Sequence, residues 1–193
     1  MPDQSAILTM ADLHFGKRTA RFNPTILERR LDKLAEKLIA EKHSVDELVV
    51  ALLGDVNDGT GIYPTQIHHQ TVGNPEQQAD LLSDVLARFF ATIQKAYRDI
   101  RIECVPGNHG RTGKFAHEAA NWDIVAYKYL GFKLKDAGIA VRQNTGDPFI
   151  RKVGVRGHRY LMYHGHSVRM YQSIPWYGLV QRVMRWQLTN LAP

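Results

Sequence analysis

Short apolar runs alternate with longer amphipathic stretches along the first two thirds of this chain. Residues 5–11 and 48–53 are typical of buried strands in a parallel sheet, the first of them buried on both faces, and residues 100–105 form a third, β-prone run. Between them, residues 24–39 and 75–98 carry apolar side chains at helical spacing, with charged residues on the other face. Asn23 and Pro24 supply a cap and a first-turn residue for the first helix. The alternation predicts an α/β domain.

The last third follows a different pattern. Residues 118–130 predict a third helix, and three short strands broken by turns then predict an antiparallel meander: residues 139–143, 149–155 and 159–163. Between residues 175 and 191 an apolar stripe at helical spacing predicts a final helix packed into the core: Trp176, Leu179, Val180, Val183, Met184, Trp186 and Leu188. The sequence has no repeat, low-complexity segment or linker, so one domain over residues 1–193 is expected.

Polar residues that can bind metal follow four of the predicted strands. They are Asp12 and His14, Asp55, Asn108 and His109, and His164 and His166. In open α/β sheets, ligands gather beyond the carboxyl ends of the strands, so these side chains should lie together. Asp12 and His14 would point the same way on an extended chain. Each pair alone has a simpler reading, as a strand-end cap or a Gly-Asn turn.

Two aspartates follow the second buried strand. A carboxylate at the mouth of such a strand is costly unless it is paired or metal-bound, which favours Asp55 as a site residue. Asp58 either supports the site from behind or forms the turn before Gly59. Mixed oxygen and imidazole donors suit manganese, iron or zinc more than calcium or magnesium.

Basic residues are concentrated towards the C-terminus. The chain carries a net charge of +6, and residues 137–193 hold eight basic residues and one acid, a net +7. This asymmetry predicts nucleic acid as a partner, with Arg151 and Lys152 as contacts, although a solvated basic surface gives the same pattern. Arg111 in a flexible basic loop is a further candidate. His68 and His69 in the loop 59–74 either contact substrate or are solvated.

The ordered motifs resemble those of the calcineurin-like metallophosphoesterase superfamily over residues 5–167. Its pattern is Asp-x-His, Gly-Asp, Gly-Asn-His, a later His and Gly-His-x-His; the first three match at Asp12-Leu13-His14, Gly54-Asp55 and Gly107-Asn108-His109. The run Asp12 to Lys17 (DLHFGK) looks most like the nuclease branch of DNA-repair exonucleases and their bacterial or phage relatives. The resemblance implies a four-layer α/β/β/α sandwich.

It also implies a site with two divalent ions, manganese first and iron, zinc, nickel or magnesium as alternatives. Asp12 and His14 would bind the first ion, Asp55 would bridge, and Asn108 and His164 would bind the second. His109 would contact the scissile phosphate. The expected function is hydrolysis of phosphodiesters in nucleic acid. The alternatives are a phosphomonoesterase, or an inactive or split fragment that acts as a binding module.

The closing Gly-His-x-His motif does not follow His166. Gly157-His158 and Gly165-His166 each lack the second histidine, so either His166 or His158 substitutes, or a separate C-terminal fragment complements the chain. The fold is then expected to be short at its C-terminus, with an open sheet edge that favours a homodimer. The sequence shows one cysteine, no signal peptide and no membrane-length apolar run, so a cytoplasmic location without membrane contact is expected.

Overall fold

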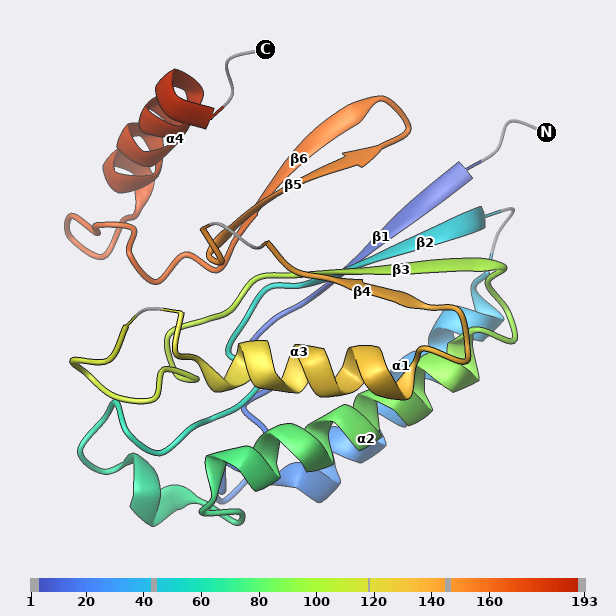
Figure 1. The fold of residues 1–193 in the computed structure, drawn as a ribbon, viewed down its shortest axis with the longest axis horizontal. Coiled ribbons are helices and arrows are strands. Elements are labelled where there is room, and N and C mark those ends of the chain that lie inside the picture. The colour runs from blue at the N-terminus through green and yellow to red at the C-terminus, as the bar shows by residue number, and fades with distance from the viewer. Residues whose placement is uncertain (1–3, 43–44, 118, 145–146, 191–193) are drawn as a thin grey trace.

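The computed structural model describes residues 4–42, 45–117, 119–144 and 147–190. Residues 188–190 are described by their backbone alone. It is an α/β fold built on a four-stranded parallel sheet (Figure 1). The strands lie in chain order: β1 (Gln4–Met10), β2 (Val45–Leu52), β3 (Asp99–Cys104) and β4 (Ala140–Arg142). Neighbouring strands are parallel throughout. The three expected strands are confirmed, each starting one to three residues earlier than expected. The expected burial of β1 on both faces is wrong, because β1 is an edge strand in which only Met10 is buried and Ile7 is 40% exposed.

Three helices cover one face of this sheet (Figure 1). They are α1 (Pro24–Ala40), α2 (Pro75–Ile93) and α3 (Trp122–Lys133). Because the strands follow one another in order, right-handed crossovers place each connecting helix on the same side. An asparagine caps each helix by accepting a backbone N–H, at Asn23, Asn74 and Asn121. The expected cap at Asn23 is confirmed, whereas α2 ends five residues early and α3 begins at residue 122 rather than 118.

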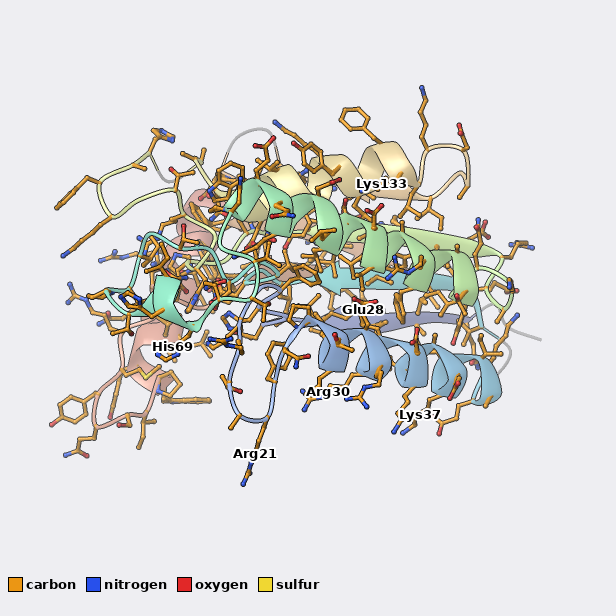
Figure 2. The ribbon with its side chains drawn as sticks, turned by 90° about the horizontal axis from the view of Figure 1, so that it is seen from below. Arg21, Glu28, Arg30, Lys37, His69 and Lys133 are labelled. Carbon is orange, nitrogen blue, oxygen red and sulfur yellow. The ribbon has the colours of Figure 1, made fainter. Side chains whose placement is uncertain are left out.

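Ion pairs join the outer sides of these helices, and Figure 2 labels one partner of each, Glu28 and Lys133. Arg88 of α2 lies 2.9 Å from Glu28 of α1, and Lys133 of α3 lies 2.8 Å from Asp80 of α2. Beneath them, the apolar faces of the helices pack on the sheet in the main core, which includes Leu52, Phe90 and other fully buried side chains. Burial of these apolar faces, rather than the exposed ion pairs, supplies most of the stability of this layer.

A hairpin covers part of the other face of the sheet (Figure 1). It consists of β5 (Ile150–Val155) and β6 (His158–Tyr163), paired antiparallel as expected. A second apolar cluster lies between hairpin and sheet: Val49, Ala51, Val105, Val153, Val155 and Met162. The strand expected at 139–143 does not belong to this meander, which corrects the sequence prediction. It is β4, which pairs parallel with β3 because α3 carries the chain back across the sheet.

The last helix, α4 (Trp176–Asn190), lies beyond the hairpin (Figure 1). Its expected packing into the core is wrong for most of the stripe. Trp186 is buried, and its ring centroid lies 5.1 Å from that of Tyr163. Trp176, Leu179, Val180 and Met184 are 41–65% exposed. The hairpin is only two strands wide, so it covers little of the helix. The side chain of Leu188 lies outside the described residues.

None of the described helices combines the length and the apolar composition needed to span a bilayer. The longest, α2, has 19 residues and mixes charged with apolar side chains along its whole length. Its apolar side faces the main core, to which seven of its buried side chains belong. The helical layer is therefore built to pack against the sheet.

A buried glutamate ties the hairpin to the parallel sheet. Glu103 on β3 is 1% exposed, and its carboxylate forms an ion pair with Arg151 of β5. Arg101 and Arg142 approach the same carboxylate at 3.2 and 3.6 Å. Arg151 was expected to contact nucleic acid, but its guanidinium is held at this ion pair with a side chain only 14% exposed. Lys152 points to solvent on the same strand.

Replacing Arg151 by Met should lower the free energy of unfolding by about 2 kcal/mol. Breaking a buried ion pair costs about 3–5 kcal/mol, and the remaining arginines reduce the loss. Urea denaturation followed by circular dichroism measures it. The matched change Lys152→Met should shift stability by less than about 0.5 kcal/mol. Equal losses in the two variants would contradict the role given to Glu103.

Candidate metal centre

The carboxyl ends of β1, β2 and β3 lie in register at one edge of the sheet. Met10 pairs with Leu52, and Leu52 pairs with Cys104, so the loops that follow begin side by side. Backbone hydrogen bonds continue the contact: the N–H of Asp12 donates to Gly54 and that of His14 donates to Asp55, at 3.1 and 2.9 Å. The register of the sheet thereby brings three polar loops together.

Three site residues adopt a left-handed backbone that non-glycine residues seldom adopt. The φ angles of Asp12, His14 and Asp55 are 56°, 44° and 50°. Asp12 and His14 are therefore not on an extended segment, which corrects the reason given for their proximity. Their side chains still meet, with Asp12 Oδ1 3.5 Å from His14 Nε2. Each such residue costs about 1–3 kcal/mol, so surrounding contacts must hold this conformation.

Asp55 lies at the centre of the cluster and is 3% exposed. Its Oδ1 accepts the backbone N–H of His109 at 2.8 Å, and its Oδ2 lies 3.1 Å from His164 Nε2. A Cβ at Gly107 would overlap this carboxylate, so the glycine of the Gly-Asn-His motif is required by close packing. Burial alone would raise the pKa of Asp55, but the hydrogen bonds from His164 and His109 outweigh it and lower the pKa.

His164 is oriented so that one ring nitrogen faces the cluster. Its Nδ1 lies 2.7 Å from the carbonyl oxygen of Leu53, which fixes a proton on that nitrogen. Its Nε2 lies 3.2 Å from Asn108 Oδ1 as well as beside Asp55. Burial would lower the pKa of His164, but the hydrogen bond and charge of Asp55 raise it. Loss of the Nε2 proton would leave a neutral ring of the kind that binds metals.

Five side chains form two groups that could each hold a metal ion. The groups are His14, Asp55 and His109, and Asp12, Asp55 and His164; within each, the ligand atoms lie within 4.8 Å of one another. Asp55 belongs to both, and Asn108 joins the second through its contact with His164. The structure thus brings all the sequence-derived ligands together. Asp12 is within reach of both histidines, since its Oδ1 lies 3.5 Å from His14 Nε2 and it also shares a group with Asp55 and His164.

Asp58 contacts two histidines of the cluster, which favours the interpretation of Asp58 as a supporting residue over that of a simple turn former. It is 2% exposed, and its Oδ1 lies 3.1 Å from His14 Nδ1 and 3.4 Å from His109 Nδ1. Gln70 donates to its other oxygen. Burial would raise the pKa of Asp58, but the two histidines and Lys17 lower it. A carboxylate in this position orients imidazoles and increases their basicity.

A hollow of about 480 Å³ adjoins the cluster on the side of His109. Lys17, Arg18 and His69 line it, together with Tyr63. The Tyr63 ring lies 4.8 Å from that of His109, and its hydroxyl accepts a hydrogen bond from Asn108 at 2.9 Å. His69 lies on the short helix η1 (Gln66–His69) at the end of the molecule that holds these loops (Figure 2). The hollow combines the positive charges of Lys17 and Arg18 with an aromatic wall, and the Asp58 carboxylate also lines it.

The remaining candidates lie at different distances from the cluster. Arg111 donates to the backbone oxygen of Asn108 at 3.1 Å, so it borders the site. His68 is exposed on η1 and does not line the hollow. His166 packs on the rings of Phe149 and His164 and belongs to neither ligand group. His158 begins β6, the end of the strand away from His164.

The sequence did not indicate one carboxylate, that of Asp123, which holds two of the loops in place. Asp123 in the first turn of α3 is fully buried, and its Oδ2 accepts the N–H groups of Asp55 and Gly107, each at 2.9 Å. Its Oδ1 accepts the N–H of Asn57 at 3.0 Å. Burial raises the pKa of Asp123 to about 6 against these hydrogen bonds, so the group is ionised above neutral pH. The sequence did not single it out, because the helix was expected to begin at residue 118 and Asp123 then falls in its second turn.

Comparison with protein-family models finds no match for this chain, and comparison with curated proteins finds no matching relative. Function is therefore inferred from the residues and their geometry. A buried, ionised carboxylate between histidines, with further carboxylate and amide oxygens nearby, offers a donor set for divalent transition metals. The adjoining hollow leaves room for a ligand beside them.

Replacing Asp123 by Asn should lower the free energy of unfolding by about 3 kcal/mol at pH 8, because an amide nitrogen would then face backbone donors and leave them unsatisfied. Urea denaturation measures the loss. Asp136→Asn on the surface is the matched control and should be neutral within about 0.5 kcal/mol. A stable Asp123→Asn protein would mean that the loops are held by other contacts.

Proposed function

We propose that this chain is a dinuclear-metal phosphoester hydrolase that cleaves phosphodiester bonds in nucleic acid. The observation that carries the proposal is the sharing of Asp55 between two overlapping ligand groups. A shared carboxylate lets two cations bind a few ångströms apart, which is the arrangement that phosphoester hydrolysis uses in many enzymes. The basic hollow beside His109 supports an anionic substrate.

In this proposal the chain is a member of the calcineurin-like metallophosphoesterase superfamily with its four-layer α/β/β/α sandwich. The motif order along the sequence supports this, and so does the succession of helices, parallel sheet, hairpin and α4. In this proposal the β5–β6 hairpin corresponds to the second sheet of the sandwich, and α4 corresponds to its outer helical layer. Two strands make that second sheet narrow.

The residues around Asp55 would hold the two ions. Asp12, His14, His164 and Asn108 would complete the ligand sets, with manganese as the first choice and iron, zinc, nickel or magnesium as alternatives. When bound, the two cations supply positive charge that acidifies a water molecule and stabilises the phosphoryl oxygens. Asp58 would keep the ring of His14 in its binding orientation, and the Leu53 carbonyl would do so for His164.

His109 lies within reach of His14 and Asp55, but in this proposal it would move a proton. Asp12, 3.5 Å from His14, would complete the ligand set of the ion at His14. Burial would lower the pKa of His109, but the hydrogen bond to Asp58 and the charges of Asp55 and Asp58 raise it. A protonated imidazole suits donation to the leaving oxygen, whereas a metal ligand must be neutral. Asp58 holds Nδ1, so the proton at Nε2 would pass to the leaving group. The Tyr63 ring against His109 would limit its rotation.

Replacing Asp55 by Asn should reduce bound manganese from about two ions per chain and lower hydrolysis of bis-p-nitrophenyl phosphate at least 100-fold. The loss follows because changes even to groups that only support ligands cost about 10–100-fold. Elemental analysis and a rate assay on the same samples measure both quantities. Asp32→Asn on the surface of α1 is the matched control. Full activity in Asp55→Asn would remove Asp55 from the site.

Replacing His109 by Ala should lower the hydrolysis rate about 100-fold or more while metal content stays unchanged. The rate of the parent should fall as pH rises through the raised pKa of His109, because the acid must be protonated, and the variant should lose this alkaline decline. The matched control is His68→Ala, which removes an exposed histidine outside the cluster and should leave the hydrolysis rate unchanged. Loss of metal in His109→Ala would instead assign His109 as a ligand.

Substrate class separates the proposal from its two alternatives. A phosphomonoesterase would hydrolyse p-nitrophenyl phosphate faster than the diester, and the proposal expects the reverse. An inactive binding module would bind no manganese and hydrolyse neither compound.

A further inference from the structure

Three arginines surround a polar hollow where the chain enters α4. Its volume is about 270 Å³, and it is lined by Ser167, Arg169, Gly178, Gln181, Arg182 and Arg185. Positions 178, 181, 182 and 185 share one face of the helix, and the segment at Arg169 closes the other side. A Cβ on Gly178 would overlap the backbone of Arg169, so the glycine lets this segment lie against the helix.

The lining is built for an anion. Arg182 donates to Ser167 and lies over the rings of Tyr163 and Trp186, at 5.7 and 5.9 Å from the centroids, which fixes its guanidinium. The sequence has no Asp or Glu after Asp147, so α4 and the preceding segment contribute no carboxylate. Asp147 lines a neighbouring hollow that also borders Arg182. Guanidinium groups bind phosphate oxygens in bidentate pairs.

Exposed aromatic rings occur at the start of α4 and in the segment before it, and Tyr177 is the one next to the hollow in the chain. Tyr171, Trp176 and Tyr177 are 65%, 65% and 69% exposed. Tyr177 lies one helical turn before Gln181, so its side chain flanks the hollow. Arginines beside exposed rings form the combination that binds single-stranded nucleic acid, in which phosphates meet the charges and unpaired bases stack on the rings. A duplex offers its phosphates but not the faces of its bases.

The hollow is also close to the candidate metal centre. Ser167 in its wall is three residues after His164, a chain reach of at most about 11 Å. His166 between them packs on both His164 and Tyr163. A strand held at α4 could therefore continue into the cluster within a few nucleotides.

We infer that the arginine hollow and the adjoining rings of α4 form a binding surface for single-stranded nucleic acid. The inference makes single-stranded nucleic acid the substrate class of the proposed hydrolase, and in that respect it rests on the proposed function. It replaces Arg151 with Arg169, Arg182 and Arg185 as the nucleic-acid contacts, because Arg151 is committed to Glu103.

The test is fluorescence anisotropy with a labelled 20-nucleotide single strand in EDTA, so that binding is measured without metal or cleavage. Replacing Arg169 and Arg185 by Ala should flatten the dependence of log K on log salt by about 1.4, since each lost phosphate contact contributes about 0.7. The matched control is Arg29→Ala with Lys33→Ala, which removes the same charge from exposed positions of α1. It should leave the slope unchanged.

A second pair of variants tests stacking. Replacing Trp176 and Tyr177 by Ser should weaken single-strand binding at least about fivefold with an unchanged salt slope, and duplex binding should change little. Phe132→Ser, at a 75% exposed ring on α3, is the matched control. Circular dichroism confirms that each variant is folded.

Equal salt slopes in the α4 and α1 variants would overturn the inference. A second result would also overturn it. If sedimentation showed that the parent protein forms a dimer, that the Trp176→Ser and Tyr177→Ser double variant does not, and that the oligonucleotide does not compete with dimer formation, the rings would serve self-association. Metal-free binding is independent of catalysis. A protein that binds the oligonucleotide but hydrolyses nothing would contradict only the proposed function.

Discussion

The Asp123 carboxylate is the interaction on which the candidate site depends. Two loops that follow different strands, one with Asp55 and one with Gly107, donate their backbone N–H groups to the same oxygen. Backbone hydrogen bonds join the Asp55 loop to the loop after β1, and Asp123 supplies the acceptor that the Asp55 and Gly107 loops share. The start of α3 is thus a structural part of the site, although none of its side chains belongs to a ligand group among the described residues.

This clamp also explains how strained backbone persists around the cluster. Asp55 holds a left-handed conformation while its N–H donates to Asp123 and its carboxylate accepts from His109. Hydrogen bonds of this kind in a buried setting are costly to break, so they can offset the conformational cost. The same contacts collect negative charge near three histidines, which favours cations at this position.

The strands and the residues around Asp55 could be predicted because a parallel sheet leaves a simple pattern of apolar and polar residues in the sequence. Buried strands are apolar throughout, and polar residues just after them must meet at one edge. Asp123 was not predictable, since an aspartate within an expected helix reveals nothing of the distant loops that its carboxylate contacts. The positive φ of Asp12 and His14 was missed because the loop that follows β1 carries no turn signal at those positions.

The misassigned packing of α4 shows a limit of helical periodicity. The period reveals that a helix has an apolar face, but the width of the neighbouring layer decides whether that face is covered. Here the neighbour is a two-stranded hairpin, which buries Trp186 and leaves Trp176 and Tyr177 in solvent. Exposed rings of this size often mark a binding surface. They lie on the chain segment that also carries Arg169, Arg182 and Arg185, which is why the proposed ligand has both phosphates and unpaired bases.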